Sequence, residues 1–175
     1  MKIRITSFID ESFVDGDGIR FAIFLQGCPH NCKGCHNPTT HDFEGGNIID
    51  TKQLIAKYKK NFLIKGITLT GGEPLCQIEA VTELASAAKK LNLSVWCYTG
   101  YIYENITNEN FRKNEFFTRA QINKFLNYVD VLVDGPYIES QRDLTLQFRG
   151  SKNQRLIDIP KSLEHKKIIA WSLSN

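Results

Sequence analysis

The spacing of apolar and polar residues predicts a series of short strands separated by helices. Alternating side chains over residues 2–8 and a β-rich run over 19–26 are typical of strands. A nearly continuous apolar run is typical of a strand that is buried on both faces. By these criteria, further strands are expected at 66–70, 93–98 and 129–133.

Helices are predicted between these strands from two caps and one apolar stripe. Asp50 can cap a helix that ends at about Lys60, and Thr118 can cap a helix that ends at about Tyr128. Over 77–91 the apolar residues recur on one helical face, at Ile78, Val81, Leu84, Ala85 and Ala88. The alternation predicts a parallel α/β sheet with its ligand site at the C-terminal ends of the strands.

Four of the predicted strands are followed by residues suited to chemistry. A cysteine-rich loop, 27–38, follows the second strand, and the turn 71–74 (Gly-Gly-Glu-Pro) follows the third. Thr99 and Asp134 come directly after the next two strands. Because the C-terminal ends of parallel strands meet at one edge, these segments are expected to form one rim.

The cysteine loop carries Cys28, Cys32 and Cys35, with three and then two residues between them. Three thiolates on one short loop can hold three corners of an iron–sulfur cube, whereas a fully ligated cube takes four cysteines. One iron is then open to a small molecule. Catalytic metal sites likewise keep one coordination position free. The alternative is a closed zinc site in which His30 or His36 is the fourth ligand.

Composition limits the classes of protein that fit. A length of 175 residues suits one domain, 1–175, and a net charge of +3 does not require nucleic acid as a partner. The apolar runs are far shorter than the ~20 residues needed to cross a bilayer, and no signal peptide begins the chain. Five cysteines, an odd number, fit metal ligation in a reducing compartment. A cytoplasmic protein is expected, with Cys76 and Cys97 as small core residues.

The chain resembles the radical S-adenosylmethionine superfamily through Cys-x3-Cys-x2-Cys followed by Gly-Gly-Glu-Pro. The resemblance implies one 4Fe-4S cluster on the three cysteines, with an open iron that binds S-adenosylmethionine as cosubstrate. It also implies that an electron from the cluster cleaves this cosubstrate to methionine and a 5'-deoxyadenosyl radical. Glycines at 71 and 72 suit this chemistry, because bare backbone can approach a ligand closely.

Within that superfamily, residues 14–20 (VDGDGIR), 24–28 (FLQGC) and 35–38 (CHNP) resemble the glycyl-radical activating enzymes, which remove hydrogen from a glycine of a large partner enzyme. The resemblance is greatest to the activators of anaerobic (class III) ribonucleoside-triphosphate reductase, through 131–137 (VLVDGPY) and 148–155 (FRGSKNQR). It implies that reductase as the protein substrate, and flavodoxin or a similar protein as the electron donor.

The first alternative is a pyruvate formate-lyase activating enzyme. Those activators are generally longer, and they tend to have aspartate and lysine where this chain has Tyr98 and Pro136. A radical enzyme for a small molecule, such as a deazaguanine synthase, is more distant, and a zinc-binding interaction module belongs to a different class. Two departures from the family are Asp17, where proline is usual, and Glu73, where many reductase activators have aspartate.

The resemblance also assigns roles to single residues. The three cysteines match the cluster ligands, and Asp134 matches a strand-end carboxylate near the cofactor and the incoming glycine, which makes it the candidate catalytic residue. Arg149 and Ser151 are candidate contacts with the cofactor or the partner. The candidate S-adenosylmethionine contacts are Gly34, Cys35, His36, Gly71, Gly72, Glu73, Thr99, Asp134 and Asn153.

For the fold, the resemblance and the length imply an incomplete TIM-like barrel of about six strand–helix units with mostly parallel strands, since a closed barrel takes about 250 residues. The resemblance covers about 8–159. The polar stretch 105–115 is expected to be a surface loop or a short helix, and the tail 160–175 has no assigned structure.

Overall fold

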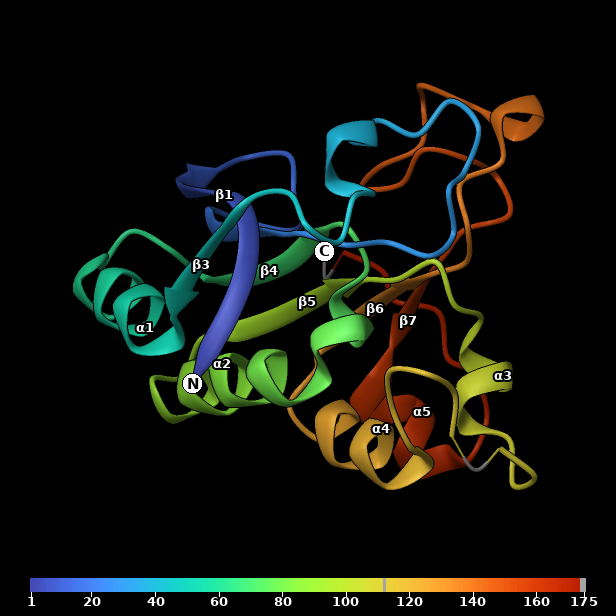
Figure 1. Cartoon of the computed structure of the whole chain (residues 1–175). Coiled ribbons are helices and arrows are strands. Elements are labelled where there is room, and N and C mark those ends of the chain that lie inside the picture. The colour runs from blue at the N-terminus through green and yellow to red at the C-terminus, as the bar shows by residue number, and fades with distance from the viewer. Residues whose placement is uncertain (112, 174–175) are drawn as a thin grey trace.

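A computed structural model of the chain describes residues 1–111 and 113–173. Its strands form one seven-stranded sheet in the order β3-β1-β2-β4-β5-β6-β7 (Figure 1). The mixed α/β class is confirmed, and a strand lies at each of the five predicted places. The strands are β1 Lys2–Ser12, β2 Arg20–Leu25, β3 Asn47–Asp50, β4 Gly66–Gly71, β5 Ser94–Tyr98, β6 Val131–Asp134 and β7 Arg155–Asp158.

The predicted helices and both of their caps are also present. The Asp50 side chain accepts the Lys52 N–H at 3.0 Å, and Thr118 forms a capping box with Gln121. The stretch 105–115 contains the end of a short helix and then a loop, apart from residue 112, which lies outside the described range. The helices are α1 Thr51–Lys60, α2 Ile78–Lys90, α3 Tyr103–Thr107, α4 Arg119–Leu126 and α5 Ile159–His165, with 3-10 turns η1 Pro38–Thr40, η2 Pro74–Gln77 and η3 Glu139–Gln141. None of the described helices is both long and apolar enough to span a bilayer.

The strands are mostly parallel, as expected, but both flanks of the sheet are antiparallel. The central strands β2, β4, β5 and β6 pair in parallel. β1 pairs antiparallel with β2 and β3, and β7 pairs antiparallel with β6. The antiparallel flanks could not be predicted, because the period of a strand shows which face is buried but not which strand lies beside it.

Long loops replace helices after two of the central strands. About six strand–helix units are expected for a partial barrel. The described residues contain four: β3–α1, β4–α2, β5–α3–α4 and β7–α5. β2 leads instead into the cysteine loop, and β6 leads into the loop 135–154. Because β2 and β6 are parallel, both loops leave the same edge of the sheet.

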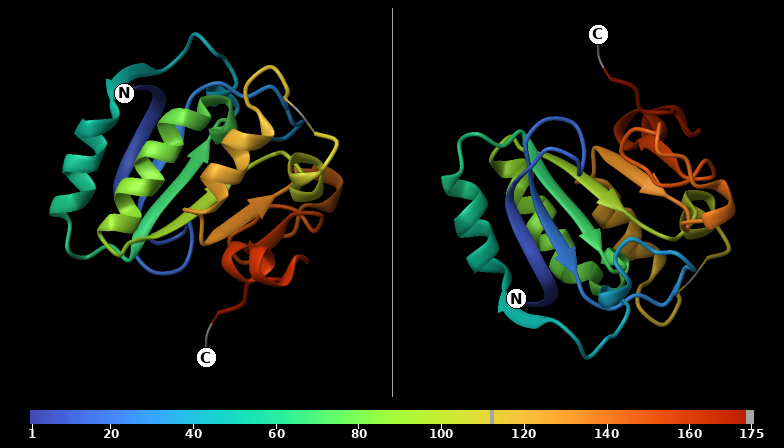
Figure 2. Two further views of the ribbon diagram at one scale, coloured as in Figure 1. Left: turned by 90° about the horizontal axis from the view of Figure 1, so that it is seen from below. Right: turned by 90° about the horizontal axis from the view of Figure 1, so that it is seen from above.

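Helices α1, α2 and α4 cover one face of the sheet, and Figure 2 shows them in front of it in the left view. Side chains alternate along each central strand, so Val95 and Cys97 enter the main core under these helices while Trp96 enters a second cluster on the other face. Cys97 is fully buried, as expected for a small core residue. On that second face Trp96 packs against Trp171, with ring centroids 4.8 Å apart, and Thr68 Oγ1 donates to the Asp15 carbonyl at 2.7 Å.

Candidate active site

The cysteine loop is anchored to its own return segment and contains a tight turn. The Cys28 N–H donates to the His41 carbonyl at 3.1 Å, and the Cys35 N–H donates to the Cys32 carbonyl at 3.1 Å. Gly34 lies between the second and third cysteines at φ +74°. Only glycine adopts this left-handed backbone without strain, so the spacing of the last two cysteines depends on it.

The three cysteines line one hollow of about 110 Å³ at the C-terminal edge of the sheet. The segments that follow β4, β5 and β6 line the same hollow, so the structure brings the predicted rim together. A larger cleft of about 560 Å³ adjoins the hollow and shares part of its wall. The predicted residues in the hollow are Cys28, Cys32, Cys35, Gly71, Gly72, Glu73 and Thr99, and those shared with or placed in the cleft are Cys35, His36 and Arg149.

The Gly-Gly-Glu-Pro turn is fastened to the start of the cysteine loop. The Gly72 N–H donates to the Leu25 carbonyl and the Glu73 N–H donates to the Gly27 carbonyl, both at 2.8 Å. A Cβ on Gly72 would lie 2.5 Å from the Gly27 carbonyl oxygen, closer than any side chain tolerates. Glycine at this position therefore sets the distance between the turn and the cysteine loop.

Glu73 is fully buried, and four donors from described residues bond its carboxylate, with the Thr99 hydroxyl within reach of both oxygens. The Leu75 N–H and the Thr99 hydroxyl donate to Oε1 at 3.0 and 2.9 Å. The Gly100 N–H and His30 Nε2 donate to Oε2 at 2.8 and 2.9 Å. An ionised carboxylate can only accept, so His30 carries its hydrogen on Nε2. The result is a buried anion that faces the hollow.

Two of the cysteine thiols are shifted away from their metal-binding form. Burial raises the pKa of Cys28 to about 11, and burial also raises the pKa of Cys32. Metal binding takes the thiolate, so loading a cluster on this loop releases protons. The third sulfur, Cys35 Sγ, accepts the Asn37 N–H at 3.4 Å. Such hydrogen bonds orient a ligand and tune the metal that it binds.

The two histidines proposed as fourth zinc ligands are engaged elsewhere. His30 Nε2 bonds Glu73, and the His36 ring lies against Tyr137 with centroids 5.2 Å apart. Within 1–111 and 113–173, no three His, Cys, Asp or Glu side chains converge as a closed site for a single metal ion requires. Three thiols that border the same hollow as a buried carboxylate suit a cluster with one iron open to a small molecule.

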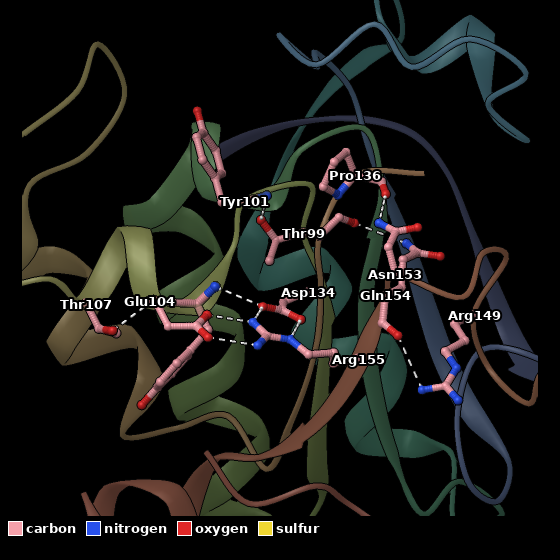
Figure 3. Close-up of polar contacts among 12 residues, drawn as sticks. Thr99, Tyr101, Glu104, Thr107, Asp134, Pro136, Arg149, Asn153, Gln154 and Arg155 are labelled. Atoms are coloured by element: carbon pink, nitrogen blue, oxygen red, sulfur yellow. Dashed lines mark hydrogen bonds and ion pairs between the residues drawn. The ribbon is translucent and has the colours of Figure 1, made fainter. Parts of the chain in front are cut away.

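Asp134 ends β6, but its carboxylate bonds to protein groups and does not line the hollow (Figure 3). The side chain is 1% exposed, and its oxygens accept Arg155 Nε at 3.0 Å and the Tyr103 N–H at 2.8 Å. Arg155 continues to Glu104, with Nη1 2.8 Å from Oε1, and this bond holds the pKa of Glu104 below its usual value. The two residues after Asp134 line the hollow in its place.

The remaining predicted contacts lie on the loop between β6 and β7 (Figure 3). Asn153 Nδ2 donates to the Pro136 carbonyl at 2.7 Å, while the buried Oδ1 has no partner among the described residues. Arg149 borders the larger cleft, and its buried Nε is also unpartnered in that range. Ser151 is fully buried and bonds within the loop. Buried polar atoms without a partner mark places where a ligand or water completes the bonding.

Gln154 and His30 are among the residues of the site that are absent from the predicted contacts. Gln154 borders both cavities, and its amide spans the loop by donating to the Gly135 carbonyl at 3.2 Å and accepting the Gly150 N–H at 2.9 Å. It lies within 148–155, so the family resemblance is the signal that could have found it. His30 appears in the sequence only as a possible zinc ligand, and no local pattern reveals its bond to Glu73.

Comparison with known proteins gives three findings. A family model described as a 4Fe-4S single cluster domain matches residues 14–157. Proteins named anaerobic ribonucleoside-triphosphate reductase-activating protein match from Haemophilus influenzae, at 34% identity over 81% of this chain and 88% of the relative, and from Enterobacteria phage T4, at 35% identity over 82% and 86%. The crystal structure of QueE from Escherichia coli superposes with a TM-score of 0.48 at 17% identity, over 77% of this chain and 70% of that chain.

Proposed function

Because the chain belongs to the family of anaerobic ribonucleoside-triphosphate reductase-activating proteins, we propose that it activates this reductase by forming a glycyl radical on it. The match to a 4Fe-4S single cluster domain supports radical S-adenosylmethionine chemistry, in which methionine and a 5'-deoxyadenosyl radical form. The observation that carries the proposal is the single hollow bordered by three cysteines and the buried carboxylate of Glu73.

In this proposal Cys28, Cys32 and Cys35 hold the cluster, and Gly72 and Glu73 receive the amino group of S-adenosylmethionine. The cluster, when bound, supplies the electron and the open iron that cleavage of the cosubstrate needs. No lysine or arginine of the described chain bonds the Glu73 carboxylate. A cationic amine supplies the charge partner that a buried anion otherwise lacks.

The larger cleft then receives the adenosyl part of the cosubstrate. Cys35 and His36 border the cleft on the side of the cysteine loop. Gly34 lines neither cavity, and its proposed part is to hold the turn that presents these two residues. Asn153 is a further proposed contact: it lines neither cavity, but its buried Oδ1 has no partner among the described residues and can accept a hydroxyl or amine of a ligand that reaches this loop. The Thr99 hydroxyl orients Glu73 rather than the adenosyl group.

Asp134 acts in this scheme as a positioning residue rather than a catalytic one. Its carboxylate holds Arg155 and the Tyr103 N–H and thereby fixes the end of β6, from which Gly135 and Pro136 reach the hollow. Gly71, at φ +90°, does the same for the end of β4. Both residues fix a strand end, so their replacement is expected to move the rim, and Gly71 in addition lines the hollow.

The chain, as one domain, is proposed to form an incomplete barrel whose open side admits the glycine loop of the reductase. The long loops after β2 and β6 leave the C-terminal edge uncovered by helices in the described residues. A docked partner closes this edge and excludes water from a radical that attacks most C–H bonds. We infer flavodoxin or a similar protein as electron donor, and a cytoplasmic location, since reduced thiols and a reduced cluster need a reducing compartment.

The test mixes reduced, cluster-loaded protein and S-adenosylmethionine with either the anaerobic reductase or pyruvate formate-lyase and records electron paramagnetic resonance spectra. A glycyl doublet on the reductase alone is expected. A doublet on pyruvate formate-lyase alone assigns the chain to that partner instead. Zinc without acid-labile sulfide in anaerobically purified protein contradicts radical chemistry altogether.

Replacing Cys32 with Ala is expected to abolish both the cluster and the cleavage of S-adenosylmethionine. Two cysteines cannot hold three corners of the cube. Iron, acid-labile sulfide and methionine are measured after anaerobic reconstitution. Cys97→Ala is the matched control, because Cys97 lies in the core under the helices and is expected to keep both. Full turnover by the Cys32 variant contradicts the ligand assignment.

A further inference from the structure

The Glu73 carboxylate has no acceptor position left for a ligand. A carboxylate offers about four lone-pair positions, and four donors from described residues already bond its two oxygens. The proposed function nevertheless requires Glu73 to receive an ammonium group. One of the four donors must therefore leave when the ammonium arrives.

Three of these donors are fixed by the fold. The Leu75 N–H opens the 3-10 turn η2, whose start Glu73 itself caps. The Gly100 N–H belongs to the backbone, and the Thr99 hydroxyl lies on a buried residue whose N–H is bonded to the β6 carbonyl of Val133 at 2.9 Å. Displacing either N–H means moving the strand ends that build the rim. The Thr99 oxygen is held by the Tyr101 N–H at 3.1 Å and lies 2.9 and 3.0 Å from the two Glu73 oxygens, so turning its hydrogen away would leave a buried hydroxyl without an acceptor.

The fourth donor, His30, is different because it sits on the cysteine loop. Its side chain is 18% exposed and lies edge-on to Tyr101, with ring centroids 4.6 Å apart. The ring also lies over Gly100, where a Cβ would come within 2.3 Å of it. Rotation about its own side-chain bonds releases Glu73, and no backbone has to move. His30 is thus the donor that can be exchanged.

We propose that His30 is a positioning residue that occupies the ligand's place on Glu73 and yields it to the ammonium group of S-adenosylmethionine. This inference rests on the proposed function. Before the cosubstrate binds, the Nε2–H bond keeps a buried carboxylate satisfied, which avoids the cost of an unpaired acceptor. On binding, a bond to the cationic amine replaces it, and the ring moves within the segment between Cys28 and Cys32.

The test compares two variants of the cluster-loaded protein. His30→Phe keeps a ring next to Tyr101 but has no donor, and His30→Gln keeps a donor near the position of Nε2. Without a donor to displace, the Phe variant is expected to bind S-adenosylmethionine about tenfold more tightly than wild type, the size expected for one hydrogen bond to a charged group. The Gln variant is expected to bind within about twofold of wild type.

A ligand without the amino group separates this role from a purely structural one. The probe is 5'-methylthioadenosine, which fits the adenosyl cleft but brings no ammonium to Glu73. Its dissociation constant is expected to be the same for wild type and His30→Phe. Equal or weaker binding of S-adenosylmethionine by the Phe variant overturns the inference, as does a matching gain for both ligands.

A second measurement uses wild-type protein and does not depend on how the variants fold. In a crystal structure with cluster and S-adenosylmethionine, His30 Nε2 is expected to lie beyond hydrogen-bond distance of Glu73. A retained His30–Glu73 bond beside bound cosubstrate overturns the inference and leaves the proposed function standing. Wild-type protein that carries a cluster but neither binds nor cleaves S-adenosylmethionine refutes the proposed function instead.

Discussion

Two fully buried charged side chains lie at opposite ends of the parallel strands, and they differ in what surrounds them. Arg20 begins β2, and Glu73 follows the end of β4, its parallel neighbour. Each makes several hydrogen bonds. The partners of Arg20 all belong to fixed parts of the sheet and its loops, whereas one partner of Glu73 is His30, a side chain on the cysteine loop.

The surroundings of Arg20 are those of a structural ion. Its Nε donates to Thr68 Oγ1 at 3.1 Å and its Nη1 donates to Ser94 Oγ at 2.6 Å, while the guanidinium lies 5.6 Å from the centroid of the Trp96 ring. Burial lowers the pKa of Arg20 to about 10, which still leaves it cationic at neutral pH. No carboxylate bonds it within the described parts of the chain.

Under the proposed function, the contrast separates a buried charge that stabilises the fold from one that binds a ligand. At the Arg20 end, fixed neutral dipoles fully satisfy the charge, so the arrangement stabilises one conformation. The Glu73 carboxylate is also fully hydrogen-bonded, but one of its donors is the proposed exchangeable side chain of His30, and the carboxylate borders a hollow. We therefore expect Arg20 to contribute mainly to stability and Glu73 mainly to binding.

The largest effect is expected for Arg20→Met, which should lower the free energy of unfolding by about 3 kcal/mol. The variant leaves the Ser94 and Ile67 carbonyls and the Thr68 hydroxyl without their donor, and methionine fills only part of the space. Anaerobic urea denaturation followed by circular dichroism measures the loss. S-adenosylmethionine affinity of the folded protein should be unchanged.

Arg142→Met is the matched control, because Arg142 is exposed and its loss should cost less than about 0.5 kcal/mol. If Arg20→Met lowers the free energy of unfolding no more than this control does, then the buried Arg20 network does not stabilise the fold as expected.

The next largest effect is expected for Glu73→Gln, and here the main change is in ligand binding rather than in stability. Removing the charge weakens S-adenosylmethionine binding by about 2 kcal/mol, or about thirtyfold, because the ammonium loses its charged partner. The free energy of unfolding should fall by about 1–2 kcal/mol, less than in Arg20→Met, because the Gln amide nitrogen faces a buried backbone N–H while the cost of a buried charge is removed. Equilibrium binding and urea denaturation measure the two quantities.

Glu79→Gln, on an exposed position of α2, should change neither quantity. A loss of stability in Glu73→Gln as large as that of Arg20→Met would show that both buried charges are structural.

The sequence could predict the parts of this comparison that depend on local signals. The Asp50 cap and the capping box at Thr118 lie within a few residues of the N–H groups that they bond. The order of strands and helices then placed the cysteine loop and the Gly-Gly-Glu-Pro turn at one edge. A missed local signal is Asp158, which caps α5 and is followed by Pro160 in the first turn.

The long-range contacts could not be predicted in this way. His30 and Glu73 are 43 residues apart, and Arg20 and Ser94 are 74 apart. The sequence places Asp134 at a strand end, but its bond to Arg155 depends on β7 pairing antiparallel with β6. A polar residue at a strand end can be placed at the edge of the sheet from the sequence. The direction of its side chain depends on the neighbours that pack around it.

The smallest effect, Ser94→Ala, tests whether the two ends are independent. The variant removes one acceptor from Arg20 Nη1 and should lower the free energy of unfolding by about 1 kcal/mol. Ser94 bonds Arg20 at the start of β5, whereas Glu73 lies beyond the opposite end of the adjacent strand β4. The S-adenosylmethionine dissociation constant of Ser94→Ala should therefore change by less than about twofold. The effects of Ser94→Ala and Glu73→Gln on the free energy of unfolding should add. Urea denaturation of both single variants and the double variant measures this. Non-additivity above about 0.5 kcal/mol, or a clear loss of binding in Ser94→Ala, would mean that the strands couple the two ends and that the Arg20 network also positions the ligand site.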